Sequence, residues 1–187
     1  MNLTWQAICE LVYGTRTSPV TGKQIPSSEF GTLVHKEIEL QIEAMMSGEE
    51  REDNPWTPYA MPFIEWLQDE GIEPHHTELI VYNDDIMIAG SVDFVGRRTD
   101  GSLVMADYKC RANCKGKVKK YDKDCRQLAI EAWMLNTEAA TLPECITVCI
   151  DCDTGTHYHH TWSDKDVVHG ITAVKLCAAL FWHCRMG

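Results

Sequence analysis

The chain has 187 residues, of which 44% are hydrophobic and 24% charged, and its formal net charge is −11 at pH 7. This length and composition suit one globular domain with a sizeable core, and the chain is too short for two domains of ordinary size. We therefore expect a single domain over residues 1–187. No apolar run approaches the roughly 20 residues of a membrane span, and the first five residues lack the basic region of a signal peptide. We therefore expect a cytoplasmic protein without membrane attachment.

Hydrophobic periodicity and turn residues divide the chain into helices and strands. Residues 14–27, rich in proline and glycine, read as a loop; Ser27 or Ser28 can cap the helix that follows, and Gly48 ends it. The buried stripe of that helix is expected to be Leu33, Ile38, Leu40, Ile42 and Met45. The elements expected in chain order are helices over 3–13, 27–48 and 59–70, strands over 77–82, 86–96 and 103–106, a helix over 122–136, strands over 145–151 and 156–162, and a long helix opened by a capping box at 163–166. This order indicates a mixed α/β (α+β) fold with a central mixed sheet of about five strands flanked by helices.

Two of the expected strands bring acidic side chains to one place. Asp93 lies on the strand over 86–96, and Asp107 follows the apolar run that begins at Leu103. Asp107 and Lys109 are two residues apart, so on a strand their side chains point to the same face. A carboxylate on a buried strand is costly unless a cation or hydrogen bonds meet it. Two acids and an ammonium together suit metal-assisted phosphodiester hydrolysis, although aspartates also flank strands in proteins without such a site.

A strongly basic segment follows the Asp-x-Lys strand. From Lys109 to Arg126 the chain carries eight basic residues and two acidic ones, whereas the remainder is strongly acidic. A local basic patch beside a carboxylate site favours a phosphate backbone as partner, while a merely solvated loop is the alternative.

Upstream, the expected second helix carries a histidine with an acid four residues later. His35 and Glu39 lie on one helix face, so the acid could orient the imidazole, and imidazole is a common metal ligand.

Taken in order, these pieces resemble the PD-(D/E)xK nuclease superfamily, and within it the RecB-like branch that includes phage-type exonucleases. Two positions depart from the pattern of that branch: Glu131 stands where an aromatic residue is expected, and Asp93 follows Ser91-Val92 without the lead proline. The matching residues are Gly31, His35 and Glu39 on the helix, Gly90 and Asp93, Asp107 and Lys109, and Gln127 on the helix over 122–136.

The resemblance implies a restriction-endonuclease-like core and a metal-dependent deoxyribonuclease that acts as an exonuclease on single- or double-stranded linear DNA. Its cofactor would be Mg²⁺ or Mn²⁺, because carboxylates and carbonyls suit hard cations. Lys109 would position or activate the nucleophilic water. The implied metal ligands are Asp93, Asp107, the Tyr108 carbonyl and His35. Glu78 opens the first expected strand and is a further acidic candidate, with a solvated glutamate at the strand end as the alternative.

The resemblance also implies DNA as the partner, in replication, recombination or repair of phages and mobile elements inside a bacterial or phage-infected cell. A homo-oligomer or a recombination partner protein could supply processivity to so short a chain. The residues expected to touch DNA are Gln127, Tyr121, Arg111, Lys115, Lys117, Lys119, Lys120 and Arg126.

The cysteines raise an alternative. Nine cysteines, an odd number, indicate reduced thiols in a cytosolic-type compartment. Some members of this superfamily, including nucleases of CRISPR adaptation, hold an iron–sulfur cluster with one early and three late cysteines. This chain has Cys9 early and Cys145, Cys149, Cys152, Cys177 and Cys184 late. Buried free thiols that hold no cluster would give the same pattern of cysteines in the sequence. A second alternative is a non-catalytic nucleic-acid-binding module on the same fold.

Overall fold

The centre of the molecule is a mixed five-stranded sheet with the strand order β3-β4-β5-β6-β7. A computed structural model describes residues 14–186 except 113, 115, 119 and 136–140, so the helix expected over 3–13 lies outside the described residues. The strands are β3 (Ile72–Asn83), β4 (Ile88–Arg98), β5 (Leu103–Arg111), β6 (Glu144–Asp151) and β7 (His157–Thr161). Only β5 and β6 pair in parallel; the other neighbours are antiparallel. The predicted fold class is confirmed.

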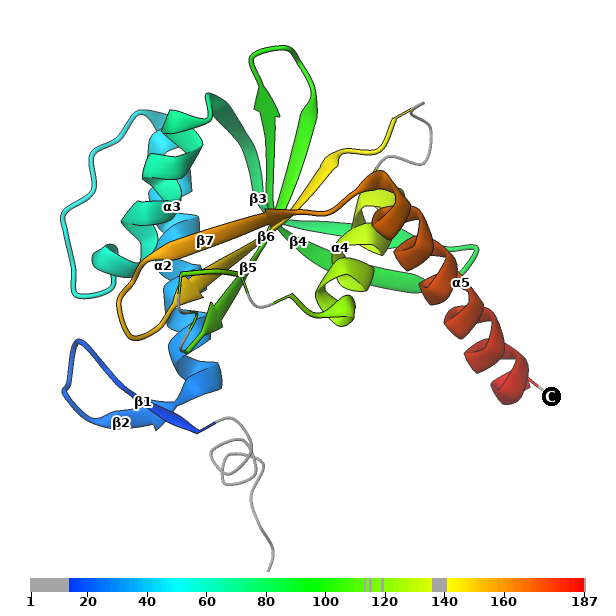
Figure 1. The fold of residues 1–187 in the computed structure, drawn as a ribbon, viewed down its shortest axis with the longest axis horizontal. Helices are drawn as coiled ribbons and strands as arrows, with labels where there is room; N and C mark the ends of the chain where they lie inside the picture. The colour runs from blue at the N-terminus through cyan, green and yellow to red at the C-terminus, as the bar shows by residue number, and fades with distance from the viewer. Residues whose placement is uncertain (1–13, 113, 115, 119, 136–140, 187) are drawn as a thin grey trace, which may run out of the picture.

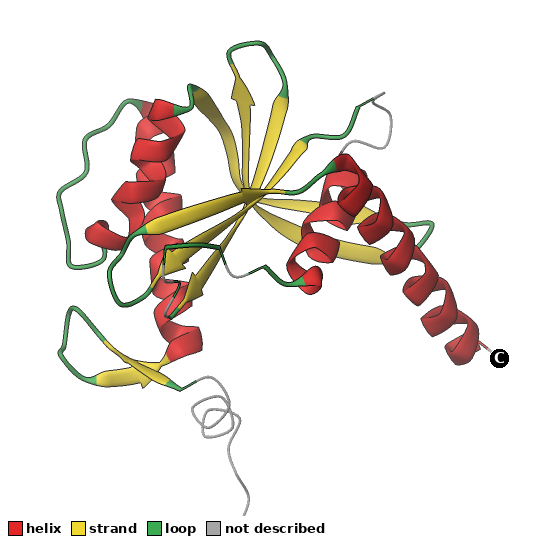
Figure 2. Cartoon of the chain, in the orientation of Figure 1, coloured by secondary structure: helices red, strands yellow, loops and turns green. Residues whose placement is uncertain are grey.

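Helices cover both faces of this sheet (Figures 1 and 2). The helices α2 (Ser27–Ser47) and α3 (Thr57–Asp69) lie on one face, α4 (Asp122–Leu135) lies on the other, and α5 (Asp164–Met186) packs against α4. Side-chain alternation along β5 separates the two cores: Val104, Ala106 and Tyr108 face α2 and α3, whereas Met105 faces α4. The same alternation turns Asp107 and Lys109 toward the α4 side.

The buried stripe of α2 agrees only in part with the one expected: Ile38 and Ile42 are buried as predicted, whereas Leu40 and Met45 are only partly buried. Phe30, Val34, Ile38 and Ile42, each four residues after the last, are almost completely buried, whereas Leu33 is 36% exposed. Gly48 ends the helix in the left-handed conformation, as predicted. The expected serine cap is wrong, because the N-cap residue is Pro26 and no side-chain cap hydrogen bond is present there.

The segment 14–27 is a hairpin, so its prediction as a loop is wrong. The strands β1 (Thr15–Thr17) and β2 (Gln24–Pro26) pair antiparallel around a turn in which Gly22 has φ +68°. Side chains add to the ladder: Thr15 Oγ1 donates to Gln24 Oε1 at 2.9 Å, and Gln24 Nε2 donates to Thr17 Oγ1 at 2.7 Å. Cross-strand polar pairs of this kind stabilise a short ladder that hydrophobic periodicity does not show.

The last helix begins at the predicted capping box. The Asp166 amide donates to Ser163 Oγ at 3.3 Å, and Ser163 Oγ donates to the Asp166 carboxylate at 2.6 Å. Contrary to the sequence expectation, α5 is long and apolar enough to cross a membrane by length and composition, and 17% of its most apolar window is buried. One such helix is weak evidence of a span. Its inner face packs closely on α4, where a Cβ on Gly170 would lie 2.8 Å from the Ala129 Cβ.

Candidate metal centre and cleft

The candidate site lies where β4 and β5 separate. Their ladder runs from Arg97 paired with Leu103 to Phe94 paired with Ala106. Beyond Phe94, β4 stays paired with β3 while β5 stays paired with β6, and the two halves of the sheet diverge (Figure 1). Asp93 is the first residue beyond the shared ladder, and its Oδ2 accepts a hydrogen bond from the Tyr108 amide at 2.8 Å. The carboxylate therefore occupies the opening between the strands.

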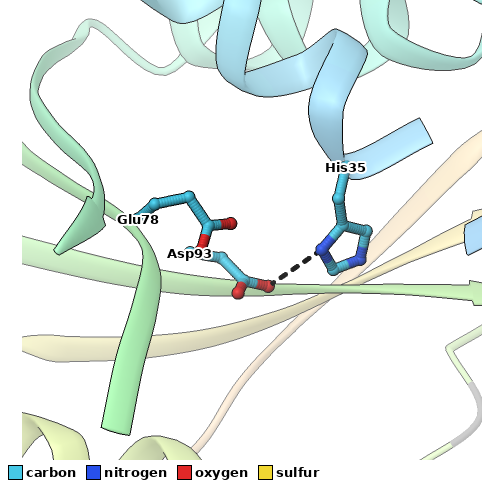
Figure 3. Close-up of side chains that lie close together, drawn as sticks. All are labelled: His35, Glu78 and Asp93. Carbon is cyan, nitrogen blue, oxygen red and sulfur yellow. Dashed lines mark ion pairs between the residues drawn. The ribbon is translucent and has the colours of Figure 1, made fainter. Parts of the chain in front are cut away.

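Three potential metal ligands meet at this opening. His35 from α2, Glu78 from β3 and Asp93 from β4 each offer one atom, and these atoms lie within 4.8 Å of one another (Figure 3). His35 Nδ1 is 3.7 Å from Asp93 Oδ2. Burial, with the nearby Lys109 ammonium, lowers the pKa of His35 below its usual 6.5, so the imidazole is neutral at pH 7 and free to ligate. Tyr108, the expected main-chain ligand, hydrogen-bonds through its backbone with both Asp93 and His35.

Glu78 reaches the group through a strained backbone. The register pairs Thr77 with Phe94 and Leu79 with Val92, which places Glu78 opposite Asp93. Its φ is +50°, a left-handed conformation that costs a non-glycine residue roughly 1–2 kcal/mol. Ser91 Oγ donates to Glu78 Oε2 at 3.0 Å and holds the side chain. Such strain in the middle of a strand is typical of functional positions.

Asp107 and Lys109 form a close ion pair next to this group. Lys109 Nζ donates to Asp107 Oδ1 at 2.5 Å, and the Asp107 side chain is 1% exposed. Burial raises the pKa of Asp107 to about 6, against the opposing effect of Lys109, and burial likewise raises the pKa of Asp93 to about 6. Asp107 Oδ2 is buried and has no hydrogen-bond partner among the described residues. A buried carboxylate oxygen without a partner is the kind of atom that a cation satisfies.

The helix α4 contributes a fourth acid, Glu131, which stands where the RecB-like pattern has an aromatic residue. Gln127 Oε1 accepts from Lys109 Nζ at 3.4 Å, and Gln127 Nε2 donates to Glu131 Oε1 at 3.3 Å. Glu131 is 4% exposed, and burial raises its pKa to about 8, with Asp107 and Asp93 adding to the shift. The spacing of Gln127 and Glu131, four residues apart on one helix face, could have indicated this side chain.

A cleft of about 960 Å³ opens beside these groups. Its walls include His35, Tyr108, Lys109 and Gln127, so it reaches the candidate metal ligands through His35. The other polar and aromatic residues of the wall are Arg16, Ser27, Ser28, Thr32, Arg111, Tyr121, Lys123 and Asp124. Arg16 and Lys123 were not among the residues expected to touch DNA; Arg16 comes from the hairpin that was read as a loop.

The predicted nucleic-acid contacts divide between the cleft and other surfaces. Tyr121 and Gln127 line the cleft, and so does Arg111, which donates to the buried Asp124 at 2.5 Å and stacks on Tyr121. Arg126 lies elsewhere, in a hollow formed with α5. Two further residues, Lys117 and Lys120, are exposed but outside the cleft lining, and Lys115 and Lys119 lie outside the described residues.

Two further expectations are changed. Glu39, expected to orient His35, instead accepts from Lys36 Nζ at 2.7 Å, and the carboxylate beside His35 Nδ1 belongs to Asp93. Of the cysteines considered for a cluster, Cys145 and Cys149 are buried in β6, and Cys9 lies outside the described residues. Within the described part of the chain, the His35 group is the one set of three or more such ligands.

A scan against models of known protein families finds no match for this sequence, and a search among curated proteins likewise finds none. The site is therefore interpreted from its own chemistry.

Proposed function

We propose that the protein is a metal-dependent deoxyribonuclease that hydrolyses phosphodiester bonds of linear DNA. The observation that carries the proposal is the convergence of His35, Glu78 and Asp93 within 4.8 Å, beside the Asp107–Lys109 pair and at a basic cleft. These groups come from α2 and from three adjacent strands, so their meeting is a property of the fold and not of a short motif.

The donor set fits a divalent cation. Two carboxylates and a neutral imidazole supply three ligand atoms, and the unpartnered Oδ2 of Asp107 lies on the neighbouring strand. Mg²⁺ and Mn²⁺ take oxygen-rich sets of this kind, and Mn²⁺ accepts the imidazole more readily. When bound, such a cation supplies Lewis acidity toward a phosphodiester oxygen.

Lys109 is the cationic side chain of the site. Burial lowers its pKa, but the attraction and hydrogen bond of Asp107 outweigh that effect, so the ammonium stays protonated. The ammonium also faces the cleft that the substrate would occupy. In this position Lys109 can orient a water molecule toward a phosphate, or stabilise the charge that develops on the phosphate oxygens.

The cleft suits a polyanion although the chain is acidic overall. Arg16, Lys109, Arg111 and Lys123 place positive charge along its wall, and the half-exposed Tyr121 offers a face for stacking a base. The acidic surface elsewhere would repel DNA, so binding would be confined to the cleft. From the resemblance to RecB-like enzymes, the proposal includes exonuclease action on DNA ends.

The test is digestion of end-labelled single- and double-stranded oligonucleotides with Mg²⁺, Mn²⁺ or EDTA. We expect metal-dependent degradation of linear DNA and sparing of covalently closed circles. Asp93→Asn and Lys109→Ala should lose activity, whereas the matched variants Asp100→Asn and Lys165→Ala, on the exposed β4–β5 turn and at the start of α5, should keep it.

Four outcomes would contradict or revise the proposal in different ways. Full activity in both Asp93→Asn and Lys109→Ala would place the reaction elsewhere. Metal-independent DNA binding without turnover would favour the non-catalytic module. Rapid cutting of closed circles would keep the nuclease assignment and replace exonuclease by endonuclease. Brown, iron-containing protein after anaerobic purification would favour the iron–sulfur alternative.

A further inference from the structure

Gln127 joins Lys109 to Glu131 with the two ends of one amide. Its carbonyl oxygen lies 3.4 Å from Lys109 Nζ, and its nitrogen lies 3.3 Å from Glu131 Oε1. A lysine ammonium only donates hydrogen bonds, so the acceptor end of the amide must face Lys109. The nitrogen end then needs an acceptor on the other side, and Glu131 supplies it.

Glu131 is in turn held by the sheet. Its carboxyl lies directly over Gly90 on β4, three residues before Asp93: a Cβ on Gly90 would be 3.0 Å from Glu131 Oε1 and 3.2 Å from its Cγ. Contacts as short as these would require the Glu131 side chain to shift. The glycine therefore provides the room in which the Glu131 carboxyl sits, and β4 carries both this room and the Asp93 ligand.

These contacts form a continuous chain from the sheet to the lysine. Gly90 admits Glu131, Glu131 accepts from Gln127, Gln127 accepts from Lys109, and Lys109 pairs with Asp107. Because Glu131 is 4% exposed, water does not readily replace its hydrogen bond to Gln127.

We propose that Glu131 is a positioning residue for Lys109, which acts through the orientation of the Gln127 amide, and that Gly90 is required to make room for it. This inference rests on the proposed nuclease function, because it assigns a role in how Lys109 is held for that reaction. Glu131 need not touch the substrate or a metal.

The activity test is a mutant cycle measured with linear DNA at saturating Mn²⁺. Glu131→Ala should lower kcat about tenfold with KM changed less than about twofold, because the loss concerns orientation and not DNA binding. Glu131→Gln keeps an acceptor oxygen and should restore kcat to within about threefold of the wild type. Gly90→Ala should reproduce the loss seen in Glu131→Ala, and the double variant Glu131→Ala/Gln127→Ala should be no slower than Gln127→Ala alone.

A second readout does not depend on turnover. Acetic anhydride modifies lysines at a rate set by the exposure and protonation of the ammonium, and mass spectrometry of the Lys109 peptide measures that rate. The rate at Lys109 should rise in Glu131→Ala and Gly90→Ala and stay at the wild-type value in Glu131→Gln. Glu37→Ala is the stability control, because Glu37 is also a buried helical glutamate, but its partners lie outside the site: it accepts hydrogen bonds from Gln41, Arg51, Asn54 and Thr57.

Several results would overturn the inference. Additive losses in Glu131→Ala and Gln127→Ala would show that the two side chains act separately. Equal losses in Glu131→Gln and Glu131→Ala, or in the Glu37→Ala control, would indicate a purely structural role. If the wild type cleaves no DNA with any metal, the proposed function fails; an unchanged acetylation rate across the variants would then overturn the positioning role as well, and a changed rate would support it on its own.

Discussion

Between pH 6.5 and pH 8, the free energy of unfolding should fall less in the Glu131→Gln variant than in the wild type. Burial raises the pKa of Glu131 from its usual 4.5 to about 8, so between these values the folded protein holds a proton that the unfolded chain has released. This contribution is fully present below pH 4.5 and is lost as the pH rises through about 8. The contribution of Glu131 to stability should therefore fall with rising pH. A carboxylate in an ion pair has a lowered pKa and contributes the opposite pH dependence.

The size of the effect follows from the pH interval. Where the folded protein binds one proton more than the unfolded chain, each rise of one pH unit lowers the free energy of unfolding by about 1.4 kcal/mol. The interval from pH 6.5 to pH 8 therefore corresponds to about 2 kcal/mol. The interval is chosen because Asp93 and Asp107, with pKa values of about 6, are mostly ionised at its lower end. The Glu131→Gln variant has no proton to release and should lose about 2 kcal/mol less than the wild type over the same interval.

The assay is urea unfolding followed by tryptophan fluorescence at pH 6.5 and at pH 8, with the free energy of unfolding extrapolated to zero urea. Glu65→Gln is the control, because Glu65 is an exposed glutamate on α3 and its replacement should leave the pH dependence of the wild type. The reasoning is refuted if Glu131→Gln and the wild type lose stability equally between the two pH values. Such a result would mean that Glu131 is ionised in the folded protein at pH 6.5.

Three further variants test other parts of the site. Lys109→Met should slow cleavage at least about 100-fold while DNA affinity, measured by fluorescence anisotropy, changes less than about threefold; a parallel loss of affinity would make Lys109 a binding residue only. Glu78→Gly should raise the free energy of unfolding by about 1 kcal/mol, because glycine adopts a φ of +50° without strain, and should weaken Mn²⁺ binding measured by calorimetry; unchanged Mn²⁺ affinity would remove Glu78 from the metal ligands. Arg111→Ala leaves the carboxylate of Asp124, 1% exposed, without its ion-pair partner, and should cost about 3 kcal/mol in urea unfolding. The double variant Arg111→Ala/Asp124→Ala should recover at least half of that loss, and no recovery would show that the pair is not what stabilises this end of α4.

The sequence by itself determined the order of helices and strands from residue 27 onward and the shared strand face of Asp107 and Lys109. Both depend on local rules: a helix repeats every 3.6 residues, a strand alternates every two, and residues two apart on a strand share a face. That alternation places Asp107 and Lys109 on one strand face without reference to any tertiary contact. The hairpin at 14–27 was missed because its strands are short and are held by polar cross-strand pairs.

The tertiary structure decided which groups complete the candidate site. The sequence offered Glu78 only as a further acid; the structure places it with His35 and Asp93, because the β3–β4 register sets it opposite Asp93 and its backbone adopts a positive φ. Glu131 becomes part of the site because α4 packs on β4 where Gly90, which has no side chain, leaves room for the Glu131 carboxyl. Distances between segments far apart in the chain depend on register, strand separation and helix packing, and these are properties of the whole core.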